Sequence, residues 1–377
     1  MALYNKYRPN NFEEVCGQNH IKKVLSAQVL ANKLGNSYLF TGPAGCGKTS
    51  VARIFSAMIN SSDGITITPL LSDTYVKQIL SGKSNSDVYE LDAATSRKID
   101  DIRELRTNAV YAPLEMRKKI FIIDECHQLT SDSWEALLKI IEEPPAHLMF
   151  IFCTTRPEDV PETIETRCMS FEFRTLSTSE VHGYLKKICD LEKIVITDDA
   201  LKTLALYSNG SLRRALSVLE KVSYQEVTVD SLALELGTTT RKTVLEFIKA
   251  VTEKKYLDSL QVSTLALNKG VKVTSFIDEL AMACHDIAFS HIKHKEVNLL
   301  TKYGYTESDL TFIALVKELL IKEVGEPTNL PKLIREWINI LDINKKQTVL
   351  NLQPQYIIDM IFMDFSVNMK KFNSKPS

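Results

Sequence analysis

The sequence lacks three features that would each point to a particular class of protein. It has no run of about 18 uninterrupted apolar residues, so no segment predicts a membrane span. Its N-terminus has no apolar core, which argues against a secretory signal. Its seven cysteines are odd in number, and no two are spaced as C-x-x-C. Reduced, buried thiols in a cytosolic compartment are therefore favoured over a disulfide framework or a zinc ribbon.

The chain also has almost no net charge, with a formal value of −1. Bulk charge therefore favours no class of partner, and any contact with nucleic acid would need a local basic surface. The chain does have 377 residues, of which 25% are charged and 44% hydrophobic. This balance is typical of a folded globular protein, and the length predicts two or three domains.

The first part of the chain alternates apolar runs with amphipathic helical patterns, which is typical of an α/β domain with a parallel sheet. The apolar runs are nearly continuous, which indicates strands buried on both faces. After the first of them, apolar residues recur at helical spacing from Lys48 to Asn60. The expected strands cover residues 37–40, 88–91, 119–124, 149–153 and 169–173.

Strand signals fade after about Leu176, and helical signals replace them. Ser177 and Glu180 have capping-box spacing at the start of one helix, and Leu212 to Val222 forms another. From about residue 239 onward the periodicity again predicts helices only. We therefore expect an α/β domain over residues 1–175, a small helical domain over 176–238 and an all-α domain over 239–377.

A glycine-rich segment between the first strand and its helix fits G-x-x-x-x-G-K-[ST]. Glycines allow backbone N–H groups to wrap a phosphate, and the helix N-terminus adds positive potential. Lys48 is expected to reach the β- and γ-phosphates of ATP, and Thr49 to ligate Mg²⁺. Cys46 is interpreted as a small filler side chain. The expected nucleotide-binding residues here are Gly42, Pro43, Ala44, Gly45, Cys46, Gly47, Lys48, Thr49 and Ser50.

Polar residues end two further strands. Asp124 and Glu125 end the third strand, where the aspartate can hold Mg²⁺ and the glutamate can polarise the attacking water. Alone, the pair could also be a strand entering a solvated loop. Thr154 and Thr155 follow the fourth strand, and either hydroxyl could hydrogen-bond the γ-phosphate or the water. His127 is expected to pack or form hydrogen bonds.

Two arginines are candidates for phosphate contacts. Arg213 follows Gly210 and Ser211 and could reach the phosphates from the helical domain, although most arginines at such places are surface residues. Arg167 precedes the fifth strand, on the far side of the domain from its own phosphate loop. It could therefore serve the nucleotide of a neighbouring subunit, and such a trans arginine is typically worth about 10³–10⁵ in turnover.

As a set, these residues resemble AAA+ ATPases of the clamp-loader class, and specifically the gamma/tau motor subunits of bacterial DNA polymerase III clamp loaders. The resemblance covers roughly the first 225 residues, whereas the last third matches only in length and helical character. Besides the motifs above, it rests on Tyr7-Arg8-Pro9, Phe12, Gly17-Gln18, Leu91-Asp92-Ala93-Ala94, Ala136-Leu137-Leu138-Lys139 and Glu142-Glu143-Pro144-Pro145.

The resemblance implies a ring, usually of five AAA+ subunits with delta- and delta-prime-like partners, held by a C-terminal collar. The helical domains would then be the lid (176–238) and the collar (239–377). Using ATP and Mg²⁺, such a ring opens a sliding clamp and closes it around primer–template DNA in the bacterial cytoplasm. The resemblance assigns hydrolysis to Lys48, Thr49, Asp124 and Glu125, sensor 1 to Thr154 or Thr155, sensor 2 to Arg213, the arginine finger to Arg167, and further nucleotide contacts to Tyr7, Arg8 and Pro9.

Three departures from the family pattern are visible. The family's four zinc-binding cysteines are replaced by Ser61, Leu70, Asp73 and Val76, so we predict no zinc. Instead, Leu70, Leu71, Tyr75, Val76 and Ile79 are expected to pack as an ordinary helix. The finger motif reads Thr-Arg-Cys in place of Ser-Arg-Cys. The sequence ends after the expected collar, which predicts a short, gamma-like form and would fit a phage or mobile-element origin.

The resemblance further implies DNA contacts from Lys98, Arg103 and Lys139, with Arg97 as an additional candidate. Two alternatives stay open. Another AAA+ machine, such as a branch-migration or recombination factor, should carry a winged-helix or pore-loop module, and no such signal is found. A non-hydrolysing structural subunit should lack Lys48 or Glu125, and both are present. The ring could be homomeric or heteromeric.

Overall fold

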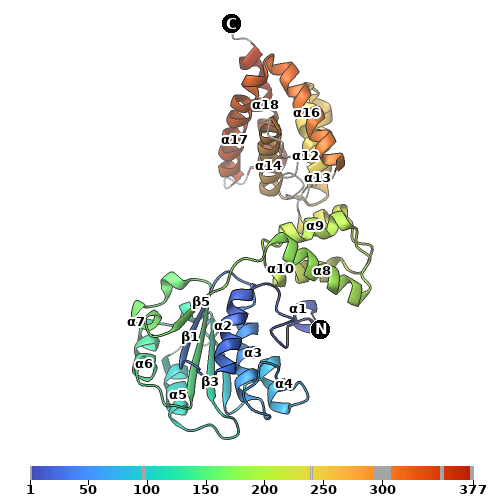
Figure 1. Cartoon of the computed structure of the whole chain (residues 1–377). Helices are drawn as coiled ribbons and strands as arrows, with labels where there is room; N and C mark the ends of the chain where they lie inside the picture. Colours follow the sequence, from blue (N-terminus) through green and yellow to red (C-terminus); the bar gives the residue numbers. More distant parts are fainter. Residues whose placement is uncertain are drawn as a thin grey trace. The chain divides into compact units, whose positions relative to one another are not determined.

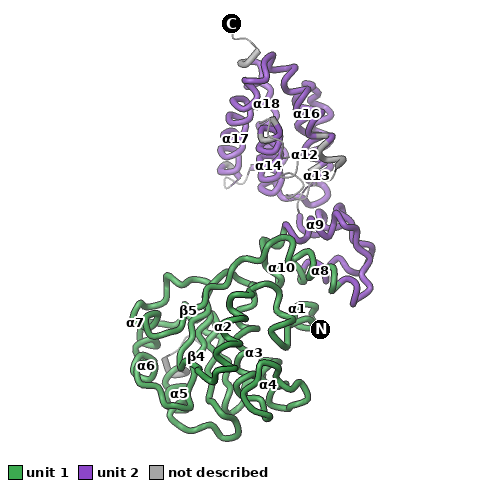
Figure 2. Tube along the Cα trace, in the orientation of Figure 1, with its two compact units in different colours: residues 1–188, 207–217 green, residues 189–206, 218–377 purple. Residues whose placement is uncertain are grey.

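The computed structural model describes residues 2–95, 99–237, 239, 241–291, 307–348 and 352–373. The chain forms two compact units, one of residues 1–188 and 207–217, the other of residues 189–206 and 218–377 (Figure 2). The expected lid segment, 176–238, contributes to both units, and the expected domain limits stay a prediction. None of the described helices combines the length and the apolar character that a membrane crossing requires.

A parallel sheet forms the centre of the first unit (Figure 1). Its five strands lie in the order β2-β3-β4-β1-β5. All five expected strands are confirmed, each to within one residue at either end. Their bounds are β1 Ser37–Thr41, β2 Val88–Asp92, β3 Lys119–Asp124, β4 Leu148–Thr154 and β5 Met169–Glu172.

Helices cover both faces of this sheet because successive side chains of a strand point to opposite faces (Figure 1). In β4 the odd-numbered residues pack with α2, α3 and α4, and the even-numbered residues pack with α5, α6 and α7. Both faces are therefore apolar, which explains the continuous hydrophobic runs of the sequence. The helices are α2 Asn19–Leu30, α3 Lys48–Asn60, α4 Thr74–Ser81, α5 Ile99–Val110, α6 Ser131–Glu142 and α7 Glu162–Glu165.

The strand register places the polar residues that end the strands side by side, at the carboxyl ends of the sheet's strands. Thr41 of β1 pairs with Thr154 of β4, and Asp92 of β2 pairs with Asp124 of β3. The loop that follows β1 therefore begins beside the residues that end β3 and β4. Ligands of parallel α/β sheets bind at this carboxyl edge.

The helix expected in place of a zinc module is α4, but it begins later than we expected. The Asp73 carboxylate accepts a hydrogen bond from the backbone N–H of Tyr75 and so fixes the start of the helix. Val76 is buried, as expected, whereas Leu70 and Leu71 lie before the helix and are 44% and 46% exposed. The expectation that these two leucines pack within the helix is therefore wrong. The predicted absence of zinc stays a prediction.

Helices form the second unit and connect it to the first. The helical patterns after Leu176 are confirmed by α8 Thr178–Glu192, α9 Asp198–Tyr207 and α10 Leu212–Val222. The expected all-α region has one core, in which Trp337 stacks on Phe365 with ring centroids 4.1 Å apart. The remaining described α-helices of this unit are α11 Val229–Leu236, α12 Arg241–Thr252, α13 Tyr256–Asn268, α14 Val273–His291, α16 Glu307–Val324, α17 Leu330–Gln347 and α18 Pro354–Asn373, and a short α1 Leu3–Lys6 begins the first unit.

Candidate active site

The phosphate loop requires glycine at two positions where another part of the chain comes close. Gly42 has φ +137°, and a Cβ there would lie 2.3 Å from the backbone oxygen of Phe173. Gly45 has φ +76°, and a Cβ there would lie 2.2 Å from the Ser211 hydroxyl oxygen. L-residues rarely adopt these conformations, so both the backbone and the space favour glycine. The loop is thus enclosed by the residue after β5 and by the residue before α10.

Lys48 is the first residue of α3, and its side chain turns back over the loop. The side chain is buried, and Nζ donates hydrogen bonds to the backbone oxygens of Gly42 and Pro43 at 2.8 and 3.0 Å. The N-terminus of α3 therefore has a full positive charge beside its own unpaired N–H groups. This combination suits a phosphate group. Burial raises the pKa of the Cys46 thiol, which fits its interpretation as an inert filler.

Two oxygen donors suited to Mg²⁺ meet beside the loop. The Thr49 hydroxyl of α3 donates a hydrogen bond to Oδ2 of Asp124, at the end of β3, over 2.7 Å. Mg²⁺ prefers oxygen ligands and is usually bound by one or two protein side chains together with substrate phosphates. The residues therefore fit the metal, and Thr49 and Asp124 would hold it.

Glu125 occupies an unusual backbone conformation at the edge of this site. Its φ of 49° and ψ of 42° lie in the left-handed region, which is uncommon for residues other than glycine. The Thr155 hydroxyl donates a hydrogen bond to Oε2 of Glu125 at 3.0 Å, and His127 Nδ1 lies 3.4 Å from the same oxygen. Strained conformations of this kind cluster at active sites. The contacts hold the Glu125 carboxylate on one side of the turn.

The two threonines at the end of β4 have different partners. Thr154 is buried, and its hydroxyl oxygen lies 3.0 Å from His127 Nδ1 and accepts a hydrogen bond from the backbone N–H of Arg156 at 3.0 Å. Thr155 is partly exposed and contacts Glu125 instead. Among the described contacts of the two threonines, only that of Thr155 with Glu125 involves an expected catalytic carboxylate. His127 forms hydrogen bonds, as expected.

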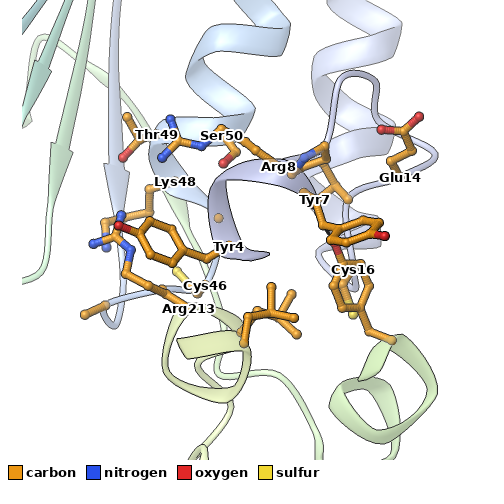
Figure 3. A pocket seen from close by; sticks show the side chains of 18 of the residues that line it. Tyr4, Tyr7, Arg8, Glu14, Cys16, Cys46, Lys48, Thr49, Ser50 and Arg213 are labelled. Atoms are coloured by element: carbon orange, nitrogen blue, oxygen red, sulfur yellow. Dashed lines mark hydrogen bonds between the residues drawn. The ribbon is translucent and has the colours of Figure 1, made fainter. Parts of the chain in front are cut away.

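One pocket of the first unit collects most of the predicted site residues (Figure 3). It brings Arg213 of α10 close to the loop, since a Cβ on Gly45 would lie 3.3 Å from the Cβ of Arg213. Desolvation lowers the pKa of Arg8, and the neighbouring Arg53 lowers it further. Three cations (Arg8, Lys48 and Arg213) and three carboxylates (Glu14, Asp124 and Glu125) thus border one pocket, which suits a polyphosphate with a metal ion. The predicted residues that line it are Tyr7, Arg8, Pro9, Ala44, Gly45, Cys46, Gly47, Lys48, Thr49, Ser50, Asp124, Glu125 and Arg213.

Two polar residues that stabilise the pocket escaped our sequence-based reasoning about function. The buried side chain of Gln18 donates to the backbone oxygen of Arg174 at 2.7 Å and accepts from its N–H at 3.1 Å. Tyr184 donates to the backbone oxygen of Tyr7 at 2.8 Å. Burial raises the pKa of Tyr184 to about 12, so its hydroxyl stays a donor at neutral pH. Both contacts attach the N-terminal segment to later parts of the first unit, and the Tyr184 contact does so at the pocket.

Arg167 lies at the amino ends of the strands, whereas the phosphate loop lies at their carboxyl ends. Met169 pairs with Tyr38, near the start of β1, whereas the phosphate loop follows Thr41 at the end of the same strand. Arg167 precedes Met169 and shares a surface hollow with Ser37. The structure therefore does not bring Arg167 to the pocket that Lys48, Asp124, Glu125 and Arg213 line. Of the other predicted site residues, Thr154, Thr155, Gly42 and Pro43 do not line that pocket either.

The predicted DNA-contacting residues are partly described. Arg103 on α5 and Lys139 on α6 are both exposed, and these two helices pack against each other on one face of the sheet. Lys98 and Arg97 lie outside the described residues. The two described candidate cations therefore lie on adjacent helices that cover one face of the sheet.

Comparisons with known proteins identify the family. Residues 17–177 match the family model described as DNA polymerase III, delta subunit, and residues 183–223 match the RCF1/5-like AAA+ ATPase lid domain. DNA polymerase III subunit gamma of Buchnera aphidicola is 34% identical over 293 residues, which are 76% of this chain and 79% of that protein. The chain belongs to the gamma/tau family of DNA polymerase III subunits. The resemblance drawn from the motifs is therefore confirmed, as is the AAA+ fold class with its lid.

Other relatives of the family are longer than this chain. DNA polymerase III subunit gamma/tau of Mycobacterium tuberculosis is 44% identical over 223 residues, which are 59% of this chain but 39% of that protein. The chain thus spans well under two thirds of the length of such gamma/tau proteins. Among solved structures, the RuvB Holliday junction branch migration motor of Thermotoga maritima is 21% identical, with a TM-score of 0.46 over 66% of this chain and 80% of that one.

Proposed function

We propose that the chain is an ATP-hydrolysing subunit of a clamp loader, a ring that opens a sliding clamp and closes it around primer–template DNA. One observation carries the proposal. The side chains suited to ATP hydrolysis meet at the carboxyl ends of the strands, while Arg167 lies at the amino end of β1. A subunit built in this way offers a pocket on one side and an arginine on the other, as a ring of similar subunits requires. Membership of the gamma/tau family supports this interpretation.

Within one subunit, the phosphates of ATP would replace the loop carbonyls as partners of Lys48. Backbone N–H groups of the loop and of α3 would bind the same phosphates. Thr49 and Asp124 would hold Mg²⁺, which would neutralise part of the negative charge on the phosphate oxygens. Arg213 would add a second side-chain cation from α10. These groups position the γ-phosphate for attack in line with its leaving oxygen.

Glu125 would orient the attacking water, and Thr155 is proposed as the sensor 1 residue. The hydroxyl of Thr155 already bonds the Glu125 carboxylate, so its position changes with that of the general base. Thr154 instead keeps His127 and the following backbone in place. Arg167 would complete the pocket of the adjacent subunit, where its charge stabilises the transition state. Hydrolysis would thus depend on assembly.

The test measures phosphate release by this chain assembled with delta- and delta-prime-like subunits, in the presence and absence of clamp and primed DNA. We expect slow turnover that clamp and DNA stimulate together. Stimulation by DNA regardless of the clamp would instead indicate another DNA-remodelling AAA+ machine. An assembled ring in which the Lys48→Ala variant of this chain is as active as the wild type would indicate a structural subunit.

A double substitution tests the proposed DNA contacts. Replacing Arg103 and Lys139 by alanine is expected to weaken DNA-stimulated turnover nearly equally on all sequences, because phosphate contacts carry no sequence information. The slope of log affinity against log salt should flatten by about 0.9 for each phosphate of duplex DNA that the variant no longer neutralises. Titrations of labelled primed DNA at several salt concentrations provide the measurement.

The matched control for this experiment removes one exposed lysine and one exposed arginine elsewhere, Lys332 and Arg335 on α17. This control keeps the overall change in net charge the same and should leave the slope close to that of the wild type. An equal slope for the wild type and the Arg103/Lys139 variant would contradict the assignment.

A further inference from the structure

The guanidinium of Arg167 is fixed by two contacts within its own subunit. Nη2 lies 2.7 Å from Oε1 of Glu142, and Nη1 donates a hydrogen bond to the backbone oxygen of Thr163 at 2.5 Å. Two contacts on different nitrogen atoms define the plane of a guanidinium group. Because the group has five N–H donors, others remain available for a further acceptor.

The ion pair lies at the surface, where an adjacent subunit could reach it. The side chains of Arg167 and Glu142 are 38% and 40% exposed. Both line a hollow at the amino end of β1, together with Ser37 and Met169. The Ser37 hydroxyl is buried there and has no hydrogen-bond partner among the described residues. The arginine therefore stands at the rim of an open hollow.

Stability of the subunit does not explain the position of Glu142. It is the last residue of α6, where the helix carbonyl groups create negative potential and a carboxylate is unfavourable. Glu143 follows directly and adds a second negative charge. An exposed ion pair contributes little to the stability of a folded protein. The contact is better explained by what it does to the arginine.

We propose that Glu142 is a positioning residue that holds the Arg167 side chain in the orientation needed to reach the nucleotide of the adjacent subunit. The inference rests on the proposed function and adds a residue to it. A free arginine samples many rotamers, and each subunit contact would have to select one of them. Held by Glu142 and by the Thr163 carbonyl, the guanidinium is oriented before the subunits meet. This role requires a hydrogen-bond acceptor in the side chain of residue 142, and its contact with Arg167 would persist in the assembled ring.

The experiment compares Glu142→Ala and Glu142→Gln in the assembled complex with clamp and primed DNA. Glu142→Ala is expected to lower kcat by a factor of up to about 10² with little change in the KM for ATP, because a misplaced group costs turnover rather than binding. Glu142→Gln should retain kcat within about threefold, since its amide oxygen still accepts a hydrogen bond. In an Arg167→Ala background, Glu142→Ala should cause no further decrease in kcat, because the two residues act as one unit.

The control variant is Glu135→Ala, which removes an exposed carboxylate from the same helix and should leave kcat unchanged. Thermal unfolding of each variant confirms that the subunit is folded. Wild-type or faster turnover of Glu142→Ala, beside a large defect of Arg167→Ala, would overturn the positioning role and leave the proposed function intact. An Arg167→Ala complex with normal turnover would instead overturn the proposed function itself.

Discussion

Replacing Arg167 by alanine is expected to reduce ATP turnover of the assembled complex by a factor of about 10³–10⁵. The side chain lies at the edge of the sheet opposite its own phosphate loop, so the defect falls on the adjacent subunit. Nucleotide binding by the isolated subunit should be unchanged, since Arg167 does not line its pocket. Phosphate release by the assembled ring and binding of a fluorescent ATP analogue by the isolated subunit provide the two measurements.

The mixing of subunits makes this prediction more specific. Rings assembled from Arg167→Ala and Lys48→Ala chains should regain activity only at interfaces where an intact arginine faces an intact phosphate loop. Such recovery would not occur if Arg167 served its own pocket. Full-speed hydrolysis by the isolated wild-type chain as a monomer would contradict the whole scheme.

Replacing Glu125 by glutamine is expected to lower turnover by a factor of about 10²–10⁴, the usual contribution of a general base. Glutamine has nearly the same shape and can still accept the hydrogen bond from Thr155, so the turn should keep its conformation. ATP affinity should stay the same or increase, because a negative charge beside the phosphates is removed. Equilibrium binding and single-turnover hydrolysis separate the two effects.

Two further variants define how the Glu125 result is interpreted. Lys48→Ala should lose binding and turnover together, because its ammonium group contacts the phosphates themselves. Thr155→Val should lower turnover less than Glu125→Gln does, because it removes the hydroxyl that bonds the Glu125 carboxylate and leaves the carboxylate itself in place. If Glu125→Gln hydrolysed ATP at more than about half the wild-type rate, its assignment as the base that activates water would be wrong.

The sheet and the phosphate loop could be predicted from the sequence because their signals are local. A strand buried on both faces is a continuous apolar run, and β3 has such a run from Ile120 to Ile123. The loop motif needs only consecutive residues, and α3 begins and ends at the predicted positions. The start of α4 was missed because the side chain of Asp73, and not the apolar pattern of Leu70 and Leu71, decides where the helix begins.

Other parts of the site depend on contacts between distant segments, which no local pattern contains. Gln18 was part of a recognised motif, but its hydrogen bonds go to a backbone 156 residues away. Thr154 and Thr155 are equivalent in sequence, and only the fold shows that the second faces Glu125. The partner of Arg167 is likewise at the end of a separate helix. Sequence patterns therefore indicated the types of catalytic residue, and the tertiary structure revealed their partners.

The Lys48 ammonium group, bonded to two carbonyl oxygens of its own loop, has a consequence for the order of events in a working cycle. After the product nucleotide dissociates, the backbone oxygens of the loop can accept the hydrogen bonds of the Lys48 ammonium group, so the loop needs no rearrangement. Reloading must then break those internal bonds, so the incoming triphosphate competes with the protein itself. The nucleotide-free loop would thus keep the conformation that binds a triphosphate. An anion that interacts only weakly with Lys48 would not displace the loop carbonyl oxygens, so the loop would select for strongly binding anions.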